Sequence, residues 1–158
     1  MVDESPGAQL REAALALDPA RIGLTQGQGL GPVWGFVMDS TFEDSANWFS
    51  LVALADGSTS LYTSGLFAII GGGNYRQVRR ANAALLQLVA GALESLEPMG
   101  STALPPSGMV TLRALTFDGP KAISVKESEL HNESLVGQVY SASHNVISVL
   151  RSLPEVGM

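Results

Sequence analysis

The chain has 158 residues, of which 15 are acidic and nine are basic, so its formal net charge at pH 7 is -6. Hydrophobic residues make up 46% of it, a composition typical of a globular protein rather than a disordered one. The excess of acidic groups repels nucleic-acid backbones and anionic membrane surfaces. We therefore expect neither nucleic-acid binding nor membrane binding.

The length fits one domain with a sizeable core. We expect a single domain over residues 1–158, with its core roughly between residues 8 and 153. The start of the chain, Met1 to Pro6, is acidic and lacks the basic and apolar regions of a signal peptide. No apolar run reaches the length of a membrane span. These features predict a cytoplasmic protein.

The N-terminal part predicts one helix and one strand. Ser5-Pro6 is typical of a helix start, and apolar residues recur at helical spacing until Asp18-Pro19 ends the pattern. A glycine-rich connection at 23–32 then leads into the strand formers of residues 33–38.

An acidic group follows this first strand. Asp39, Glu43 and Asp44 are close in sequence, so a cation site is conceivable there. The group lacks the alternating oxygen ligands and fixed glycine of a calcium-binding loop. We interpret it as a solvated loop.

Two hairpins are predicted, each around an Asp-Gly pair, Asp56-Gly57 and Asp118-Gly119. The pairs separate strand-like runs at 48–55 and 58–64, and at 109–117 and 120–126. Asp-Gly between two such runs is the strongest short-range hairpin signal, and it predicts a type I′ turn with positive φ at both central residues.

The longest helical pattern starts at Asn74, directly after three glycines, and ends at Glu97-Pro98. Its outer face carries small, uncharged residues where a solvent-facing helix normally carries charges. We expect this face to form an interface through Ala83, Ala84, Gln87, Ala90 and Gly91. A last helix is predicted from its cap at Ser134 to Pro154.

The predicted order is α-β-β-β-α-β-β-α. Because the strands bunch together rather than alternate with helices, the order favours an α+β fold over a doubly wound parallel one. We expect a five-stranded, mainly antiparallel sheet with about three helices.

This order resembles the profilin-like group of small α/β modules, which includes roadblock/LC7 and longin-type domains. The stretch 50–62, followed by Gly71-Gly72-Gly73, is also similar to uncharacterised bacterial proteins. The resemblance to the profilin-like group implies a dimer-forming scaffold, sometimes paired with a small GTPase, and it implies no catalytic residue. Roadblock-type domains usually place two strands before the central helix and three after it, whereas this sequence predicts the opposite split.

The glycine run is the strongest local candidate for a ligand site. Backbone N–H groups at a helix start attract anions, and three arginines follow within two turns. The candidate residues are Gly71, Gly72, Gly73, Asn74, Arg76, Arg79 and Arg80. The run lacks the lysine of a P-loop, and the interpretation we favour is that the glycines only make a tight crossing from strand to helix.

The remaining side chains predict no catalytic residue, no metal site and no cofactor. His131 lies in a loop and His144 on the polar face of the last helix, where we expect it to be exposed. No spacing supplies a nucleophile, a base and an orienting partner together. The aromatic residues that we expect in the core are Trp34, Phe36, Trp48 and Phe49.

The resulting hypothesis is a non-enzymatic, cytoplasmic interaction or scaffold module that forms a homodimer. The alternative is a small-molecule sensor that binds an anion between Gly71 and Arg80. An enzyme is the least favoured class.

Overall fold

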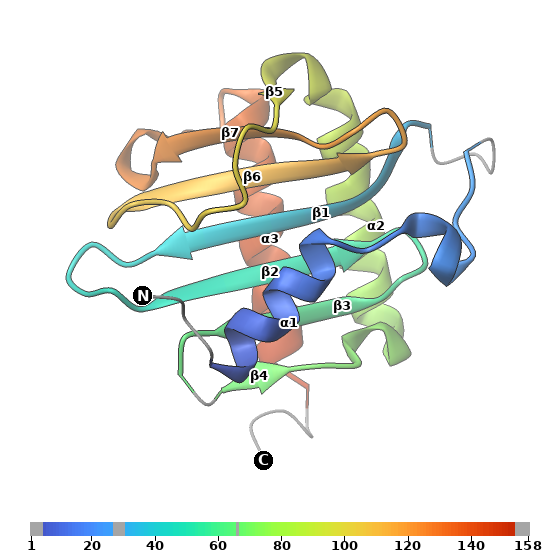
Figure 1. Ribbon diagram of the computed structural model, residues 1–158, viewed down its shortest axis with the longest axis horizontal. Coiled ribbons are helices and arrows are strands. Elements are labelled where there is room, and N and C mark those ends of the chain that lie inside the picture. Colours follow the sequence, from blue (N-terminus) through green and yellow to red (C-terminus); the bar gives the residue numbers. More distant parts are fainter. Residues whose placement is uncertain (1–4, 27–30, 66, 154–158) are drawn as a thin grey trace.

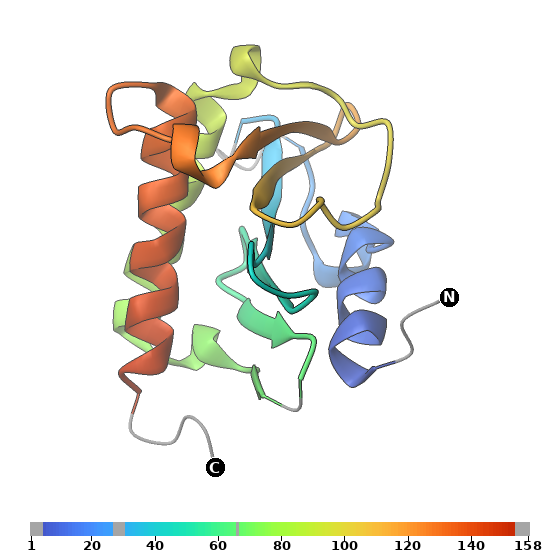
Figure 2. The same cartoon turned by 90° about the vertical axis from the view of Figure 1, so that its left-hand side faces the viewer.

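The computed structural model describes residues 5–26, 31–65 and 67–153, which form an α+β fold of three layers (Figure 1). An antiparallel sheet lies in the middle, with helix α1 on one face and helices α2 and α3 side by side on the other (Figure 2). These helices span Pro6–Leu15 (α1), Arg76–Gly91 (α2) and Leu135–Arg151 (α3). Short 3-10 turns lie at Pro19–Ile22, Gly72–Asn74, Leu93–Ser95 and Glu127–Glu129.

The sheet has seven strands rather than the five that we expected. Their order is β4-β3-β2-β1-β6-β7-β5. The strands are β1 Val33–Thr41, β2 Trp48–Leu54, β3 Thr59–Thr63, β4 Ala68–Ile69, β5 Glu97–Pro98, β6 Met109–Thr116 and β7 Lys121–Lys126. The additional strands, β4 and β5, are two residues long and extend the sheet at its two edges. A segment this short has no hydrophobic period, so a sequence pattern cannot reveal it.

Both predicted hairpins are present, but their turns are not of type I′. Glycine alone has positive φ among the described residues, with 96° at Gly57 and 112° at Gly119. The Gly57 amide donates to Leu54, and the Leu54 amide donates to Ser58. This pattern is a tight turn followed by a glycine bulge, the usual form of a three-residue hairpin loop.

The helix starts follow from their caps. Ser5 accepts a hydrogen bond from the Ala8 amide and Ser134 accepts one from the Gly137 amide, so both predicted caps are confirmed. Helix α2 begins at Arg76 rather than Asn74, because the residues before it form a separate 3-10 turn.

Hydrophobic side chains form two clusters, one on each face of the sheet. The larger lies under α2 and α3 and contains Phe36, with Phe49 packed against it, while the smaller lies under α1 and contains Trp34 and Trp48. The predicted placement of these aromatic residues in the core is confirmed. Within the described part of the chain, no helix has the length and apolar character needed to cross a bilayer.

Candidate functional site

The glycine run owes its composition to close packing. A Cβ on Gly72 would overlap the Leu150 side chain, and one on Gly73 would overlap the Gly57 carbonyl. Gly71 adopts positive φ, 81°. These contacts explain each glycine without a ligand, as in the interpretation that we favoured.

The three arginines after the run differ in their contacts. Arg79 donates from Nη1 to the Gly73 carbonyl at 2.8 Å and thereby ties the run to α2. Arg76 and Arg80 are exposed at the start of the helix. Anion binding by Gly71, Gly72, Gly73, Asn74, Arg76, Arg79 and Arg80 stays a prediction.

The structure places a buried charge cluster on the other face of the sheet. Asp39 is 0% exposed and lies in the central strand β1. Its carboxylate accepts two hydrogen bonds from Arg11 of α1, from Nε at 3.0 Å and from Nη2 at 2.8 Å. It also accepts hydrogen bonds from Arg113 of β6, through Nη1, and from the Ser50 hydroxyl of β2.

Sheet register explains why these side chains meet. Asp39 pairs with Ser50 on one side and with Thr111 on the other, and Arg113 follows Thr111 by two residues. Side chains two residues apart on a strand, and those directly opposite each other, share a face. All four therefore point to the α1 face, where Arg11 reaches them from above.

The same arginines hold the loop between β5 and β6. Arg11 donates to the Thr102 carbonyl, and Arg113 donates from Nη2 to the Ala103 carbonyl at 2.7 Å. The cluster thus joins α1, the sheet and this loop.

The cluster carries more positive than negative charge. Two buried guanidinium groups share the one carboxylate of Asp39; Arg11 has a second acidic neighbour, Glu12, at 3.5 Å, but that side chain is mostly exposed. The Arg113 side chain is 1% exposed, and its Nε–H has no hydrogen-bond partner among the described residues. Buried charged groups normally have every polar atom paired, so this unpaired donor needs an explanation.

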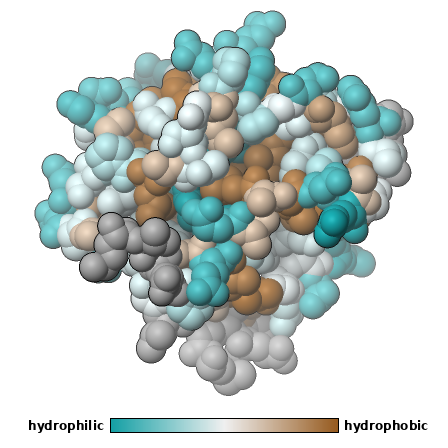
Figure 3. All heavy atoms as spheres, in the orientation of Figure 1, coloured by the Kyte–Doolittle hydropathy of each residue, from teal (hydrophilic) through white to brown (hydrophobic). Residues whose placement is uncertain are grey.

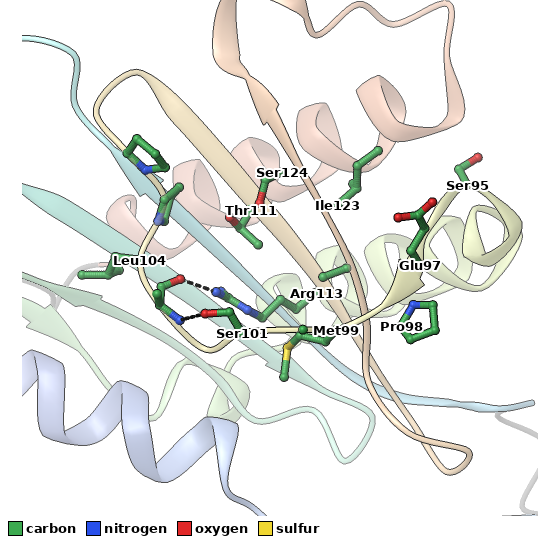
Figure 4. Close-up of a pocket in the computed structure, with 15 residues that line it drawn as sticks. Ser95, Glu97, Pro98, Met99, Ser101, Leu104, Thr111, Arg113, Ile123 and Ser124 are labelled. Carbon is green, nitrogen blue, oxygen red and sulfur yellow. Dashed lines mark hydrogen bonds between the residues drawn. The ribbon is translucent and has the colours of Figure 1, made fainter.

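Arg113 lines a hollow of about 580 Å³ beside the cluster, which we name the Arg113 hollow (Figure 4). Its walls come from the loop at 99–106 and from β5, β6 and β7. Thr111 and Ser124 supply hydroxyl groups that share a hydrogen bond of 2.8 Å, while Met99 and Ile123 are apolar. On the face of the molecule that carries α1 and this loop, apolar atoms gather near the middle among hydrophilic ones (Figure 3).

The sequence interpretation missed this cluster. We expected Asp39 to lie in a solvated loop with Glu43 and Asp44, which is wrong for Asp39, because β1 continues to Thr41. Glu43 and Asp44 are exposed, as expected. The available signal was Arg113, a charged residue in the middle of a strongly apolar strand, which needs a buried partner of opposite charge.

The two histidines differ in their surroundings. His131 is exposed in its loop. His144 is half-buried, and its ring lies against Phe49 and Tyr140, so our expectation of an exposed side chain is wrong. It lies at the edge of the buried face of α3, about one turn before the buried Ile147, where the Phe49 ring of β2 contacts it.

In the described ranges, no group of three or more histidine, aspartate or glutamate residues is arranged to hold a metal ion. Comparisons with protein-family models, curated proteins and solved structures found no match to the chain. The resemblance to the profilin-like group stays a prediction.

Proposed function

We propose that the chain is a binding module, with the role of a sensor, for a small organic carboxylate that sits in the Arg113 hollow. The observation that carries this proposal is the unpaired Nε–H of Arg113 in a cluster with one carboxylate for two guanidinium groups. An anion next to Arg113 balances the charge and accepts the unpaired hydrogen bond.

Arg11 provides the pattern for such a contact within the same cluster. It grips Asp39 side-on through Nε and Nη2, the bidentate geometry that guanidinium groups form with carboxylates. Arg113 uses Nη1 for Asp39 and Nη2 for the Ala103 carbonyl, so its Nε edge is the one left for a ligand.

The walls of the hollow favour a monoanion with an apolar body. Met99, Leu104 and Ile123 offer apolar contacts, Thr111 and Ser124 offer hydroxyl groups, and the exposed carboxylate of Glu97 in the wall disfavours a second negative charge on the ligand. A volume of about 580 Å³ falls in the range of small-molecule sites.

Binding at this place acts on the loop as well. The Nε atom is itself buried, so an oxygen reaches it only when the groups around Arg113 shift. Because Thr102 and Ala103 are held by the two arginines of the cluster, occupancy of the hollow changes how the loop is held. This coupling is what makes the module suited to sensing.

A thermal-shift screen tests the proposal with benzoate and hexanoate as probes and with sulfate and inorganic phosphate for comparison. A ligand at about 100 times its Kd adds about 2.7 kcal/mol to the free energy of unfolding, which raises Tm by several degrees. Arg113→Lys keeps the charge but lacks the Nε–H edge, so we expect it to remove the carboxylate shift.

Two further variants locate the site. Thr111→Val with Ser124→Ala leaves the charge cluster in place and should weaken the shift, whereas Arg79→Ala with Arg80→Ala should leave it unchanged. Loss of the shift in the Arg79/Arg80 variant alone would assign the anion to the glycine run instead. A flat screen with all four probes contradicts the proposal.

The second candidate function is a cytoplasmic, non-enzymatic interaction module that forms a homodimer through α2 and, by analogy with the profilin-like group, contacts a small GTPase. It is favoured by one observation. The residues of the small face are all exposed, and they are Ala83, Ala84, Gln87, Ala90 and Gly91. Small side chains let a second backbone approach closely.

Size-exclusion chromatography with light scattering tests this second function. We expect a dimer at micromolar concentration that Ala84→Glu and Ala90→Glu dissociate, because each places a charge in the contact. The matched control is Ala13→Glu, the same substitution at an exposed position of α1, on the opposite face of the sheet. A monomeric wild-type protein, or a dimer that survives both substitutions, contradicts it.

A further inference from the structure

A second hollow lies on the opposite face of the sheet, at the end of the molecule that faces the viewer in Figure 2. It has a volume of about 570 Å³ and is bounded by the loops after β1 and β3 and by the last turns of α3. We name it the aromatic hollow, after the side chains of Phe42, Phe49, Phe67 and His144 in its wall. It shares no lining residue with the Arg113 hollow.

Aromatic rings form a continuous row along this hollow. The ring centres of Phe42 and Phe49 are 5.8 Å apart, those of Phe49 and His144 are 6.1 Å apart, and those of His144 and Tyr140 are 4.5 Å apart. All three separations are typical of favourable edge-to-face or tilted ring contacts. The row ends at the exposed side chain of Phe42.

Two phenylalanines stand exposed at the hollow. Phe42 is 49% exposed and Phe67 is 39% exposed, and both are part of its wall. Scattered exposed apolar residues need no explanation, but two large rings around one cavity leave an apolar surface to be covered.

His144 adds an unpaired polar atom to this apolar surface. Its Nε2 is buried and has no hydrogen-bond partner among the described residues. Glu127, the acidic group whose charge acts on His144, already accepts a hydrogen bond from the Tyr140 hydroxyl at 2.6 Å. Burial lowers the pKa of His144, against the opposing charge of Glu127, so the ring is neutral at pH 7 and Nε2 needs a partner of its own.

We propose that the aromatic hollow binds a small uncharged phenol, whose ring packs beside Phe49 within the hollow and whose hydroxyl group pairs with Nε2 of His144. A hydroxyl group fits either tautomer of the histidine, because it both donates and accepts hydrogen bonds. A phenol keeps its proton at pH 7, so it enters a mostly apolar wall without the cost of burying a charge. Volumes of this size hold small aromatic molecules.

A pair of matched probes tests the proposal, with 1-naphthol as the phenol and naphthalene as the same ring system without the hydroxyl. Binding is followed by NMR on the full chain, where the aromatic ring signal of Phe49 reports from the wall of the hollow. We expect 1-naphthol to shift this signal and to bind about tenfold more tightly than naphthalene, as one buried hydrogen bond provides. Equal affinity for the two probes overturns the role of the hydroxyl group.

A third probe, 1-naphthoate, separates the proposal from attraction by Arg151, the positively charged residue of the wall. We expect 1-naphthoate to bind more weakly than 1-naphthol, because the carboxylate must lose its hydration in an apolar wall. Tighter binding of 1-naphthoate overturns the proposal, since the hollow would then select anions.

Variants assign the contacts. His144→Phe keeps a ring in the row and should bring the affinity for 1-naphthol down to that for naphthalene; His144→Gln serves as the second variant at this position. Phe67→Ser removes an exposed ring and should weaken both probes. The matched control, Leu135→Ser, removes an exposed apolar side chain outside the hollow and should weaken neither.

Unchanged binding in Phe67→Ser, or a preference for 1-naphthol that persists in both His144 variants, contradicts the proposal. The Arg113→Lys variant should bind 1-naphthol as the wild type does. The test of phenol binding in the aromatic hollow is therefore independent of carboxylate binding in the Arg113 hollow.

Discussion

At the scale of single residues, Asp39 connects three elements of the fold. It accepts hydrogen bonds from α1, β2 and β6 through Arg11, Ser50 and Arg113. Such a buried ion group is weak evidence of net stabilisation, because both partners lose their hydration. Breaking it is costly in every case, since the remaining charges stay buried without a counter-ion.

Asp39→Asn should therefore lower the free energy of unfolding by about 3 to 5 kcal/mol, because it leaves two buried guanidinium groups without a carboxylate. Urea or guanidinium denaturation measures this loss. Asp44→Asn is the matched control: the same substitution in the exposed loop nearby should change stability by about 0.5 kcal/mol or less. Equal losses of stability in the two variants would contradict this prediction, because removing the buried carboxylate would then cost no more than removing an exposed one.

His144 gives the second prediction at this scale. Burial lowers its pKa below the ordinary 6.5, and Glu127 opposes the shift. The unfolded chain then binds a proton more readily than the folded one, so this residue favours folding above pH 6.5 and the contribution is lost as pH falls below that value.

Between pH 7.5 and 5.5, the wild-type protein should lose more stability than His144→Phe, as measured by denaturation at each pH. The carboxyl groups change little over most of this interval, and the exposed His131 is common to both proteins. Parallel stability profiles for the two proteins would contradict the expected shift.

At the scale of elements, the crossing from β4 to α2 depends on glycines that have no room for a side chain. A Cβ on Gly73 would meet the backbone of the Asp56-Gly57 hairpin, which cannot move aside as the end of a side chain can. At Gly91, the last residue of α2, a Cβ would meet nothing within 4 Å. A substitution at Gly73 therefore tests close packing, whereas one at Gly91 tests helix propensity alone.

Gly73→Ala should destabilise the protein by about 1 to 3 kcal/mol, the usual cost of overpacking. Gly91→Ala should stabilise it by about 0.5 to 1 kcal/mol, because alanine favours the helix more than glycine does. Thermal unfolding of the two variants beside the wild type measures both. Shifts of the same sign at the two positions would count against the packing explanation.

At the scale of the whole molecule, short sequence motifs predicted the hairpins and the helix starts. They did not predict which distant residues the folded chain brings together. The Asp-Gly pairs gave both hairpins, and Ser5 and Ser134 gave the starts of two helices. The edge strands β4 and β5 were not predicted, because a strand of two residues shows no alternation of apolar and polar side chains. The charge cluster was not predicted for a different reason. Arg11, Asp39 and Arg113 are far apart in the sequence; the pairing of β1 with β6 places Asp39 and Arg113 on one face, and the packing of α1 on that face adds Arg11.

The same cluster couples α1 to the loop between β5 and β6, because Arg11 bonds both Asp39 and the Thr102 carbonyl. Arg11→Ala should therefore raise amide hydrogen exchange in α1 and in residues 99–104 together, while β2, which lies inside the sheet, keeps its protection. Arg21→Ala, an exposed arginine in the 3-10 turn after α1, is the matched control and should leave both segments unchanged. Faster exchange confined to α1 would mean that the loop is held by Arg113 and by its contacts to Thr41, and that the two segments open separately.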